Sequence, residues 1–226
     1  MNGSTLLRGE LFPSHLLGSA RGALAGAGSE YALGHPGRCP HSPTLTVFDF
    51  DNSGSVSGVS GNDPIASRFV EARLAIEKVS RRCRCGHERA AVLHFDTPTS
   101  SDIAPIALKG GGTRRIEQGL RIPRDGAGTS VLGPSLHAAY GLAEQHPDHE
   151  SVLVVLSDFE LFDNDVPGVL KEFVDFPGTV HAVVLRATPP AVLLEDDRVT
   201  VTHIDYADPP GAVAKAVFEA LITHRR

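Results

Sequence analysis

Residues 44–55 read TLTVFDFDNSGS, and this stretch decides the fold. Its nearly continuous apolar run is typical of a strand buried on both faces of a parallel sheet. The run gives way at Asp51 to Asn, Ser and Gly, which are residues that dominate tight turns. We therefore predict a central strand over Thr44–Phe50 that presents polar side chains at its carboxyl end.

Apolar runs and helical patterns alternate through the following sequence, which is typical of strands and helices built around a parallel sheet. The other predicted strands are Arg89–Phe95, Ile103–Leu108, Ser151–Ser157, Thr179–Leu185 and Arg198–Ile204. The predicted helices cover residues 63–82, 113–120, 166–174 and 210–223, and a further helix opens at Pro134. In the first of these helices, Asp63 is the expected N-cap and Pro64 the first helical residue. We expect an α/β fold: a Rossmann-like, open, mostly parallel six-stranded sheet with 103–108 as an antiparallel edge strand and helices on both faces.

Composition indicates a folded domain that does not bind nucleic acid. Of the 226 residues, 41% are hydrophobic and 21% are charged, and the net charge is -6. This balance provides no general attraction to nucleic acid or anionic lipid. Residues 1–42 carry many Gly, Ser, Ala and Pro residues without a sustained period. We predict a flexible or loosely docked extension over 1–42 and one domain over 43–226.

Three features bear on location. Residues 11–25 contain Leu and Ala and end in a small-x-small pattern, but Pro13, His15 and Arg21 interrupt the apolar run of a secretion signal. The chain also has 3 cysteines, an odd number with no regular disulfide framework. No apolar run is long enough to span a membrane. We therefore expect a cytoplasmic protein with reduced cysteines.

Oxygen-bearing side chains recur where predicted strands end. Asp51, Ser53 and Ser55 alternate after the first strand, Thr129 lies in the Gly-rich stretch before a helix, and Asp158 follows the strand 151–157. In an open α/β sheet such positions line the crevice where ligands bind. Carboxylates and hydroxyls without His or Cys favour Mg²⁺, Mn²⁺ or Ca²⁺ over Zn²⁺.

The pattern Asp51-x-Ser53-x-Ser55, followed by Gly128–Thr129 and then Asp158, resembles the von Willebrand factor A domain with its metal-ion-dependent adhesion site, or MIDAS. The resemblance covers the chain from about Thr44 onward. It implies that Ser53, Ser55 and Thr129 bind the metal through hydroxyls, with Asp51 and Asp158 contacting it directly or through water.

The same resemblance implies a non-catalytic module that binds a partner protein. In the family, an acidic side chain of the partner takes the open position on the metal. Intracellular members often work with AAA-type ATPases or multi-protein assemblies. The expected rim of the site comprises Asn52, Gly54, Gly128, Phe159 and Glu160. The family usually has Gly where this chain has Phe159, so the rim departs from the common pattern.

Asp49 raises an alternative, because a charge within a buried strand is costly without a partner. Asp49–Phe50–Asp51 looks like the Asp-x-Asp motif of haloacid-dehalogenase-type phosphatases, whose first Asp is the nucleophile and whose second is an acid/base beside Mg²⁺. The later Lys and acidic pair of that family have no well-placed equivalents, since Lys171 lies on a predicted helix. A structural hypothesis is that Asp49 pairs with His94 on the neighbouring strand.

The cysteines allow a second metal site, although isolated thiols in loops are the commoner case. Cys39 lies just before the first strand, and Cys83-x-Cys85-x-His87 lies just before the second. If those strands are adjacent and parallel, both segments meet at the amino edge of the sheet, opposite Asp51. Cys39, Cys83, Cys85 and His87 could then bind a structural Zn²⁺, although their spacing matches no standard zinc ribbon.

Overall fold

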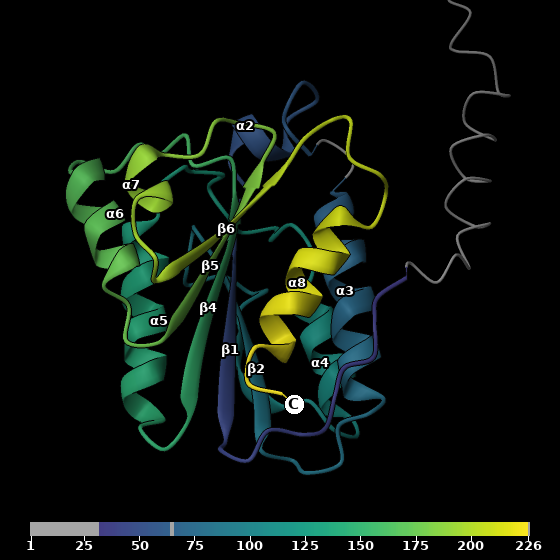
Figure 1. Ribbon diagram of the computed structural model, residues 1–226. Coiled ribbons are helices and arrows are strands. Elements are labelled where there is room, and N and C mark those ends of the chain that lie inside the picture. Colours follow the sequence, from purple (N-terminus) through teal and green to yellow (C-terminus); the bar gives the residue numbers. More distant parts are fainter. Residues whose placement is uncertain (1–31, 64–65, 226) are drawn as a thin grey trace, which may run out of the picture. The chain divides into compact units, whose positions relative to one another are not determined.

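The computed structural model describes residues 32–63 and 66–225. Leu33–Arg226 forms one compact unit. A six-stranded sheet with the order β3-β2-β1-β4-β5-β6 forms its centre (Figure 1). The strands are β1 (Thr44–Phe50), β2 (Glu88–His94), β3 (Ile103–Ala107), β4 (Glu150–Ser157), β5 (Thr179–Leu185) and β6 (Val199–Ile204).

All neighbouring strands are parallel except β2 and β3, which form the antiparallel pair at one edge. The predicted open α/β sheet with one antiparallel edge strand is therefore confirmed. Strand β1 lies between β2 and β4: the chain adds β2 and β3 on one side of β1, and then β4, β5 and β6 on the other side. Such a switch point opens a crevice at the carboxyl ends of the strands. Asp51 and Asp158 directly follow the two strands that border it.

Helices cover both faces of the sheet (Figure 1). One face carries α3 (Ser67–Ser80), α4 (Gly112–Gly119) and α8 (Ala212–Ile222). The other carries α5 (Gly133–Gln145), α6 (Val166–Val174) and α7 (Ala191–Leu194), and the short helix α2 (Gly54–Ser57) follows β1. The sequence analysis did not predict α2 or α7, because a single helical turn leaves no readable 3.6-residue period.

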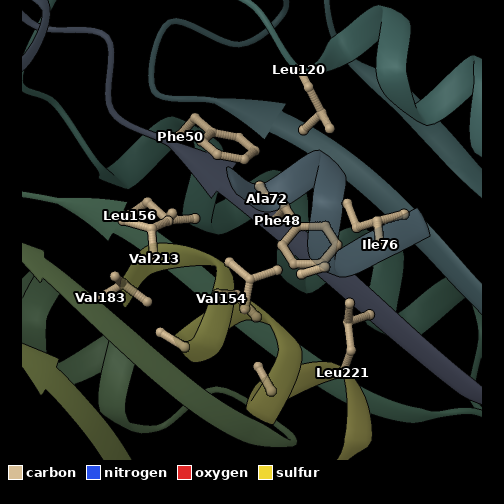
Figure 2. Packing of buried hydrophobic residues seen from close by; sticks show 14 of the residues in the cluster. Phe48, Phe50, Ala72, Ile76, Leu120, Val154, Leu156, Val183, Val213 and Leu221 are labelled. Carbon is tan, nitrogen blue, oxygen red and sulfur yellow. The ribbon is translucent and has the colours of Figure 1, made fainter. Parts of the chain in front are cut away.

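Strand β1 connects two hydrophobic cores. Every one of its residues is buried. Phe48 and Phe50 belong to the cluster that includes Ile76 of α3, and Figure 2 shows side chains of this cluster. Leu45 and Val47 belong to the cluster on the opposite face. Because side chains alternate along a strand, this burial on both faces accounts for the continuous apolar run in the sequence.

Helix α3 begins later than predicted. We expected Asp63 to be the N-cap of a helix with Pro64 in its first turn, but the helix begins at Ser67 after Ala66, whose φ of 52° lies in the left-handed region. Pro64 itself lies outside the described residues. The Asp63 carboxylate nevertheless accepts hydrogen bonds from the backbone N–H groups of Ser67 at 2.9 Å and Arg68 at 3.1 Å. Asp63 thus satisfies two free N–H groups at the start of α3 and places a negative charge near the positive end of the helix dipole, although it lies outside the helix.

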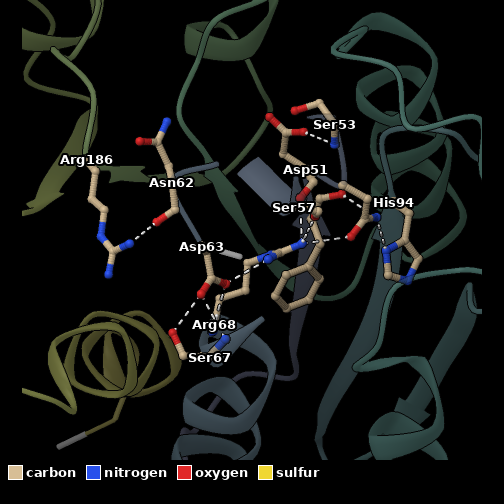
Figure 3. A network of polar contacts seen from close by, with 11 residues as sticks. Asp51, Ser53, Ser57, Asn62, Asp63, Ser67, Arg68, His94 and Arg186 are labelled. Carbon is tan, nitrogen blue, oxygen red and sulfur yellow. Dashed lines mark hydrogen bonds and ion pairs between the residues drawn. The ribbon is translucent and has the colours of Figure 1, made fainter. Parts of the chain in front are cut away.

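The guanidinium of Arg68 is fully buried at the start of α3. It donates to the Asp63 carboxylate at 2.7 Å, to the Asp51 carbonyl oxygen and the Asn52 side-chain oxygen at 3.0 Å each, and to the Ser57 hydroxyl at 2.9 Å. Figure 3 shows this network. The loop after β1 is therefore attached to α3 through one buried cation.

Among the residues that the structure describes, no helix combines the length and the apolar character needed to cross a membrane.

We predict that Arg68→Met lowers the free energy of unfolding by roughly 3–5 kcal/mol, because it leaves Asp63 as a buried charge without its partner. Arg73→Met is the matched control: Arg73 lies exposed on the same helix and pairs with Glu77 at 3.6 Å. We expect the control to change stability by at most about 0.5 kcal/mol. Urea denaturation measures both variants, and equal losses would show that the Arg68 network does not hold the loop.

Candidate metal centre

The loop after β1 brings three predicted ligands together. Asp51 and Ser53 are fully buried, and the Ser53 backbone N–H donates to Asp51 Oδ1 at 2.8 Å. The hydroxyl oxygens of Ser53 and Ser55 lie 3.0 Å apart. The turn at Ser53 and the first residues of α2 bring one carboxylate and two hydroxyls together, so Ser55 reaches the cluster from a helical turn and not from the alternating segment that the sequence predicted.

The end of β4 supplies the second carboxylate. The Ser157 hydroxyl donates to Asp51 Oδ2 at 2.6 Å, which joins the two strand ends. The next residue, Asp158, is 1% exposed and accepts hydrogen bonds from Asn62 Nδ2 at 3.0 Å and from the Glu160 N–H at 3.1 Å. These contacts orient the Asp158 carboxylate beside the Asp51 loop.

The two carboxylates influence each other. Burial raises the pKa of Asp51 above its ordinary value; the hydrogen bonds from Ser157 and Ser53 oppose this rise, and the negative charge of Asp158 adds to it. A nearby cation would favour the ionised form of Asp51. Each Asp51 oxygen accepts one hydrogen bond and keeps a further lone pair for a ligand bond. The donor set therefore fits a hard divalent cation.

Thr129 lies in a separate loop that is held by Asp96. The Asp96 carboxylate accepts from the Gly128 N–H at 2.7 Å, the Thr129 N–H at 3.0 Å and the Thr129 hydroxyl at 2.6 Å. A Cβ added at Gly128 would lie 3.6 Å from the Asn52 carbonyl oxygen, so this loop runs beside the Asp51 loop. A hydroxyl that donates its proton to Asp96 retains oxygen lone pairs for a metal.

The residues expected at the rim fall into two groups. Gly54, Gly128 and Glu160 are exposed. Asn52 is buried, where its side chain bonds to His94 Nδ1 at 2.8 Å. Phe159 is also buried; it has a φ of 57°, and its ring meets that of Phe173 edge-on at 5.8 Å. A positive φ is easy for Gly and uncommon for Phe, which is consistent with the usual Gly here.

The sequence analysis missed four residues that support these ligands. Ser157 and Asp96 could have been identified from the sequence, because Ser157 ends one predicted strand and Asp96 directly follows another. Arg68 and Asn62 had none, since each lies within or beside a helical segment and reaches the site only through the fold. The supporting residues therefore come from four separate segments of the chain.

Asp49 does not pair with His94, so that hypothesis was wrong. In the β1–β2 register, Asp49 aligns with Leu93, whereas Phe50 aligns with His94. Asp49 and His94 therefore project from opposite faces of the sheet. Burial lowers the pKa of His94 to about 4, and its neutral ring contacts Asn52 and, through Nε2 at 3.1 Å, the Gly119 carbonyl oxygen.

Asp49 instead lies beneath α5 and is fully buried. Its Oδ2 is 2.6 Å from the Ser135 hydroxyl, which also lies 3.0 Å from the Leu132 carbonyl oxygen. One hydroxyl proton cannot serve both acceptors, so a protonated Asp49 that donates from Oδ2 to Ser135 leaves the Ser135 proton for Leu132, while Asp49 Oδ1 is buried without a hydrogen-bond partner in the described part of the chain. Burial raises the pKa of Asp49 to about 8, although the Ser135 contact opposes the rise. A buried, protonated carboxyl is poorly suited to attack phosphorus.

We predict that Asp49 makes the protein less stable as pH rises from about 4 towards about 8. The folded carboxyl keeps its proton over this range, whereas the unfolded one ionises near 3.8, so folding binds a proton that high pH removes. The contribution to the slope reaches about 1.4 kcal/mol per pH unit. Asp49→Asn, whose amide can donate to Ser135, should abolish it.

The difference between wild type and Asp49→Asn in urea denaturation at about pH 6, 7 and 8 isolates this term, because His94 and His181 contribute equally to both proteins. Asp148→Asn, an exposed change of the same kind, is the control and should keep the wild-type slope. Parallel stability curves for wild type and Asp49→Asn would mean that Asp49 is ionised in the folded protein.

The cysteines meet near the amino ends of β1 and β2, at the end of the sheet that lies opposite Asp51. The thiols of Cys39, Cys83 and Cys85 and the carboxylate of Glu88 have ligand atoms that all lie within 4.8 Å of one another. His87, which we expected as the fourth member, is outside this group and exposed. Its backbone N–H bonds to Cys85, while Glu88, the first residue of β2, is buried beside the thiols.

Solved structures with a similar fold include a von Willebrand factor type A protein and a protein with a MIDAS motif. The von Willebrand factor type A protein from Catenulispora acidiphila superposes with a TM-score of 0.58 at 16% identity, over 81% of this chain and 43% of that one. The pilus adhesin SpaC from Lactobacillus rhamnosus GG gives 0.57 at 12%, over 83% and 31%. Proximal thread matrix protein 1 from the mussel byssus, with a zinc-occupied MIDAS motif, gives 0.53 at 15%, over 83% and 49%.

This chain therefore has the von Willebrand factor A fold, as the sequence resemblance implied. It spans less than half the length of each of these three structures. No protein-family profile matches the sequence, and no curated protein sequence matches it. At sequence identities of 12–16%, these comparisons establish a shared fold and nothing more specific.

Proposed function

We propose that this domain is a non-catalytic protein-interaction module that binds an acidic side chain of a partner through a divalent metal ion. The observation that carries the proposal is the meeting of Asp51, Ser53, Ser55 and Asp158 at the switch point of a von Willebrand factor A fold. Thr129 would complete the set from the neighbouring loop. Mg²⁺ is the proposed metal, and Mn²⁺ or Ca²⁺ have the same ligand preferences.

Charge explains why recognition would need the metal. Asp51 and Asp158 make the site negative, and the whole chain carries a net charge of -6. A partner carboxylate would be repelled from such a surface. A bound divalent cation supplies local positive charge and an open coordination position for that carboxylate. We infer an acidic partner on this ground, and by resemblance an AAA-type ATPase or multi-protein assembly in the cytoplasm.

The chain's own residues would keep the site in place. Ser157 and the Ser53 N–H hold the Asp51 carboxylate in one orientation, Asn62 and the Glu160 N–H hold Asp158, and Asp96 holds the Thr129 loop. Ligands that are fixed in advance by such outer contacts bind metal more tightly. Glu160 is the exposed carboxylate nearest in sequence to Asp158, so it would contribute to partner selection at the rim.

We predict that Mg²⁺ or Mn²⁺ raises the melting temperature of the wild-type domain. Metal at ten times its dissociation constant adds about 1.4 kcal/mol, which corresponds to a few degrees. Asp158→Asn should lose most of the shift because it removes a ligand charge. Asp125→Asn is the control, since Asp125 is exposed and bonds to Ser100 rather than to the cluster. A wild-type shift that Asp158→Asn fully retains would contradict the assignment.

A separate experiment tests whether the bound metal recognises a carboxylate, with acetate in place of the partner's acidic side chain. If an acidic group completes the metal's coordination, acetate should raise the melting temperature further in saturating Mn²⁺ but not in chelator, because the two ligands favour each other's binding. Chloride at the same ionic strength is the control. An acetate effect of equal size in chelator, or its absence in Mn²⁺, would argue against carboxylate recognition at the metal.

A further inference from the structure

Three thiols and one buried carboxylate meet at the amino edge of the sheet, opposite Asp51. Cys39 belongs to the segment before β1, Cys83 and Cys85 to the loop between α3 and β2, and Glu88 to the start of β2. Their ligand atoms all lie within 4.8 Å of one another. Side chains from separate segments therefore converge on one point.

The spacing of the sulfur atoms suits a tetrahedral ion. Bonds of about 2.3 Å from Zn²⁺ to two thiolates at the tetrahedral angle put the sulfurs about 3.8 Å apart. The Sγ atoms of Cys83 and Cys85 lie 3.9 Å apart, whereas a disulfide requires about 2.05 Å. All three cysteines are free thiols in this structure. The arrangement therefore resembles a ligand set more than an oxidised pair.

Backbone amides are directed at the sulfur atoms. The Arg84 N–H donates to Cys39 Sγ at 3.4 Å, and the His87 N–H donates to Cys85 Sγ at 3.4 Å. Gly86, with a φ of 75°, permits the turn that brings the second amide into place. Hydrogen bonds of this kind stabilise thiolates, which are the forms that bind metal.

The thiol pKa values diverge within the cluster. Burial raises the pKa of Cys83, and the Glu88 carboxylate raises it further. For Cys39 burial also acts upward, but the hydrogen bonds from Arg84 and Cys85 outweigh it and lower the pKa. A cation among the thiols would favour the thiolate form of both.

Arg225 binds both oxygens of the Glu88 carboxylate. Arg225 Nε donates to Glu88 Oε1 at 2.6 Å, and a second guanidinium nitrogen bonds to Oε2. The same guanidinium donates to the Pro36 carbonyl oxygen at 3.2 Å. A ligating carboxylate is commonly oriented by such an outer partner. Arg225 also offsets part of the negative charge that three thiolates and Glu88 would bring.

We propose that Cys39, Cys83, Cys85 and Glu88 bind a structural Zn²⁺ ion. Thiolates select a soft or borderline ion over Mg²⁺ or Ca²⁺, and four closed protein ligands indicate a structural role. The ion would connect the segment before β1 to the α3–β2 loop and, through Glu88 and Arg225, to the end of the described chain. This site is independent of the proposed Asp51 centre.

Zinc content tests the proposal. The measurement uses the full chain carrying Asp51→Ala, because a MIDAS site can itself hold zinc, as in the mussel protein. Reduced protein purified without chelator should contain about one zinc per chain by elemental analysis. Cys39→Ser and Cys85→Ser should reduce retention at least tenfold in competition with a chelator. His87→Ala is the matched control from the same loop and should retain the zinc.

Cobalt provides a readout that does not depend on stability. Co²⁺ added to the metal-free protein should give thiolate-to-cobalt charge-transfer absorption, reduced by about a third in Cys39→Ser because one of three thiolates is lost. Three results would overturn the proposal: reduced protein that neither contains nor takes up zinc, a Cys39→Ser variant with undiminished zinc and cobalt absorption, or a Cys83–Cys85 disulfide in protein prepared under reducing conditions. Loss of zinc in His87→Ala would overturn the assignment of Glu88.

Discussion

The buried contact between Arg68 and Asp63 is the constraint on which the carboxyl edge of the sheet depends. A guanidinium that is 0% exposed is costly unless it is paired and its N–H groups are satisfied. Here Asp63 supplies the charge, and the carbonyl of Asp51 with the side chains of Asn52 and Ser57 supplies further acceptors, which leaves Nε as the guanidinium nitrogen without a partner among the described residues. If the loop that carries the proposed ligands moved away, the terminal nitrogen that donates to Asp51, Asn52 and Ser57 would lose its acceptors as well. One ion pair therefore connects helix packing to the geometry of the site.

The sheet separates two kinds of chemistry at its two edges. Parallel strands bring their carboxyl ends together, and that edge carries carboxylates and hydroxyls around Asp51. Their amino ends meet at the other edge, where the thiols cluster around Glu88. Hard oxygen ligands and soft sulfur ligands select different ions. The proposed metal centre at the carboxyl ends of the strands would face a partner, and the proposed zinc site at their amino ends would hold the segment before β1.

Local rules are broken at several positions close to the oxygen edge, and two of them, Phe159 and Asp49, lie next to the proposed ligands. Phe159 adopts a positive φ of 57°, a conformation that costs a bulky residue about 1–3 kcal/mol, and its ring is buried against Phe173 in partial compensation. Asp49 places a carboxyl in an apolar strand and depends on Ser135 for its hydrogen bond. Departures from local preference gather near functional sites because the surrounding packing can hold them there.

The sequence by itself determined the six strands, the buried character of β1 and the positions of Asp51, Ser53, Thr129 and Asp158 after strands or before a helix, whereas the place of Ser55 within the short helix α2 was not predicted. Apolar period and turn composition are local, so they can be read along the chain. The tertiary structure alone decided the partners of the polar groups: Ser135 rather than His94 for Asp49, Asp96 for Thr129, Arg68 for Asp63, and Glu88 rather than His87 beside the thiols. Strand register and helix docking bring together residues far apart in sequence, and no local pattern encodes which of them meet.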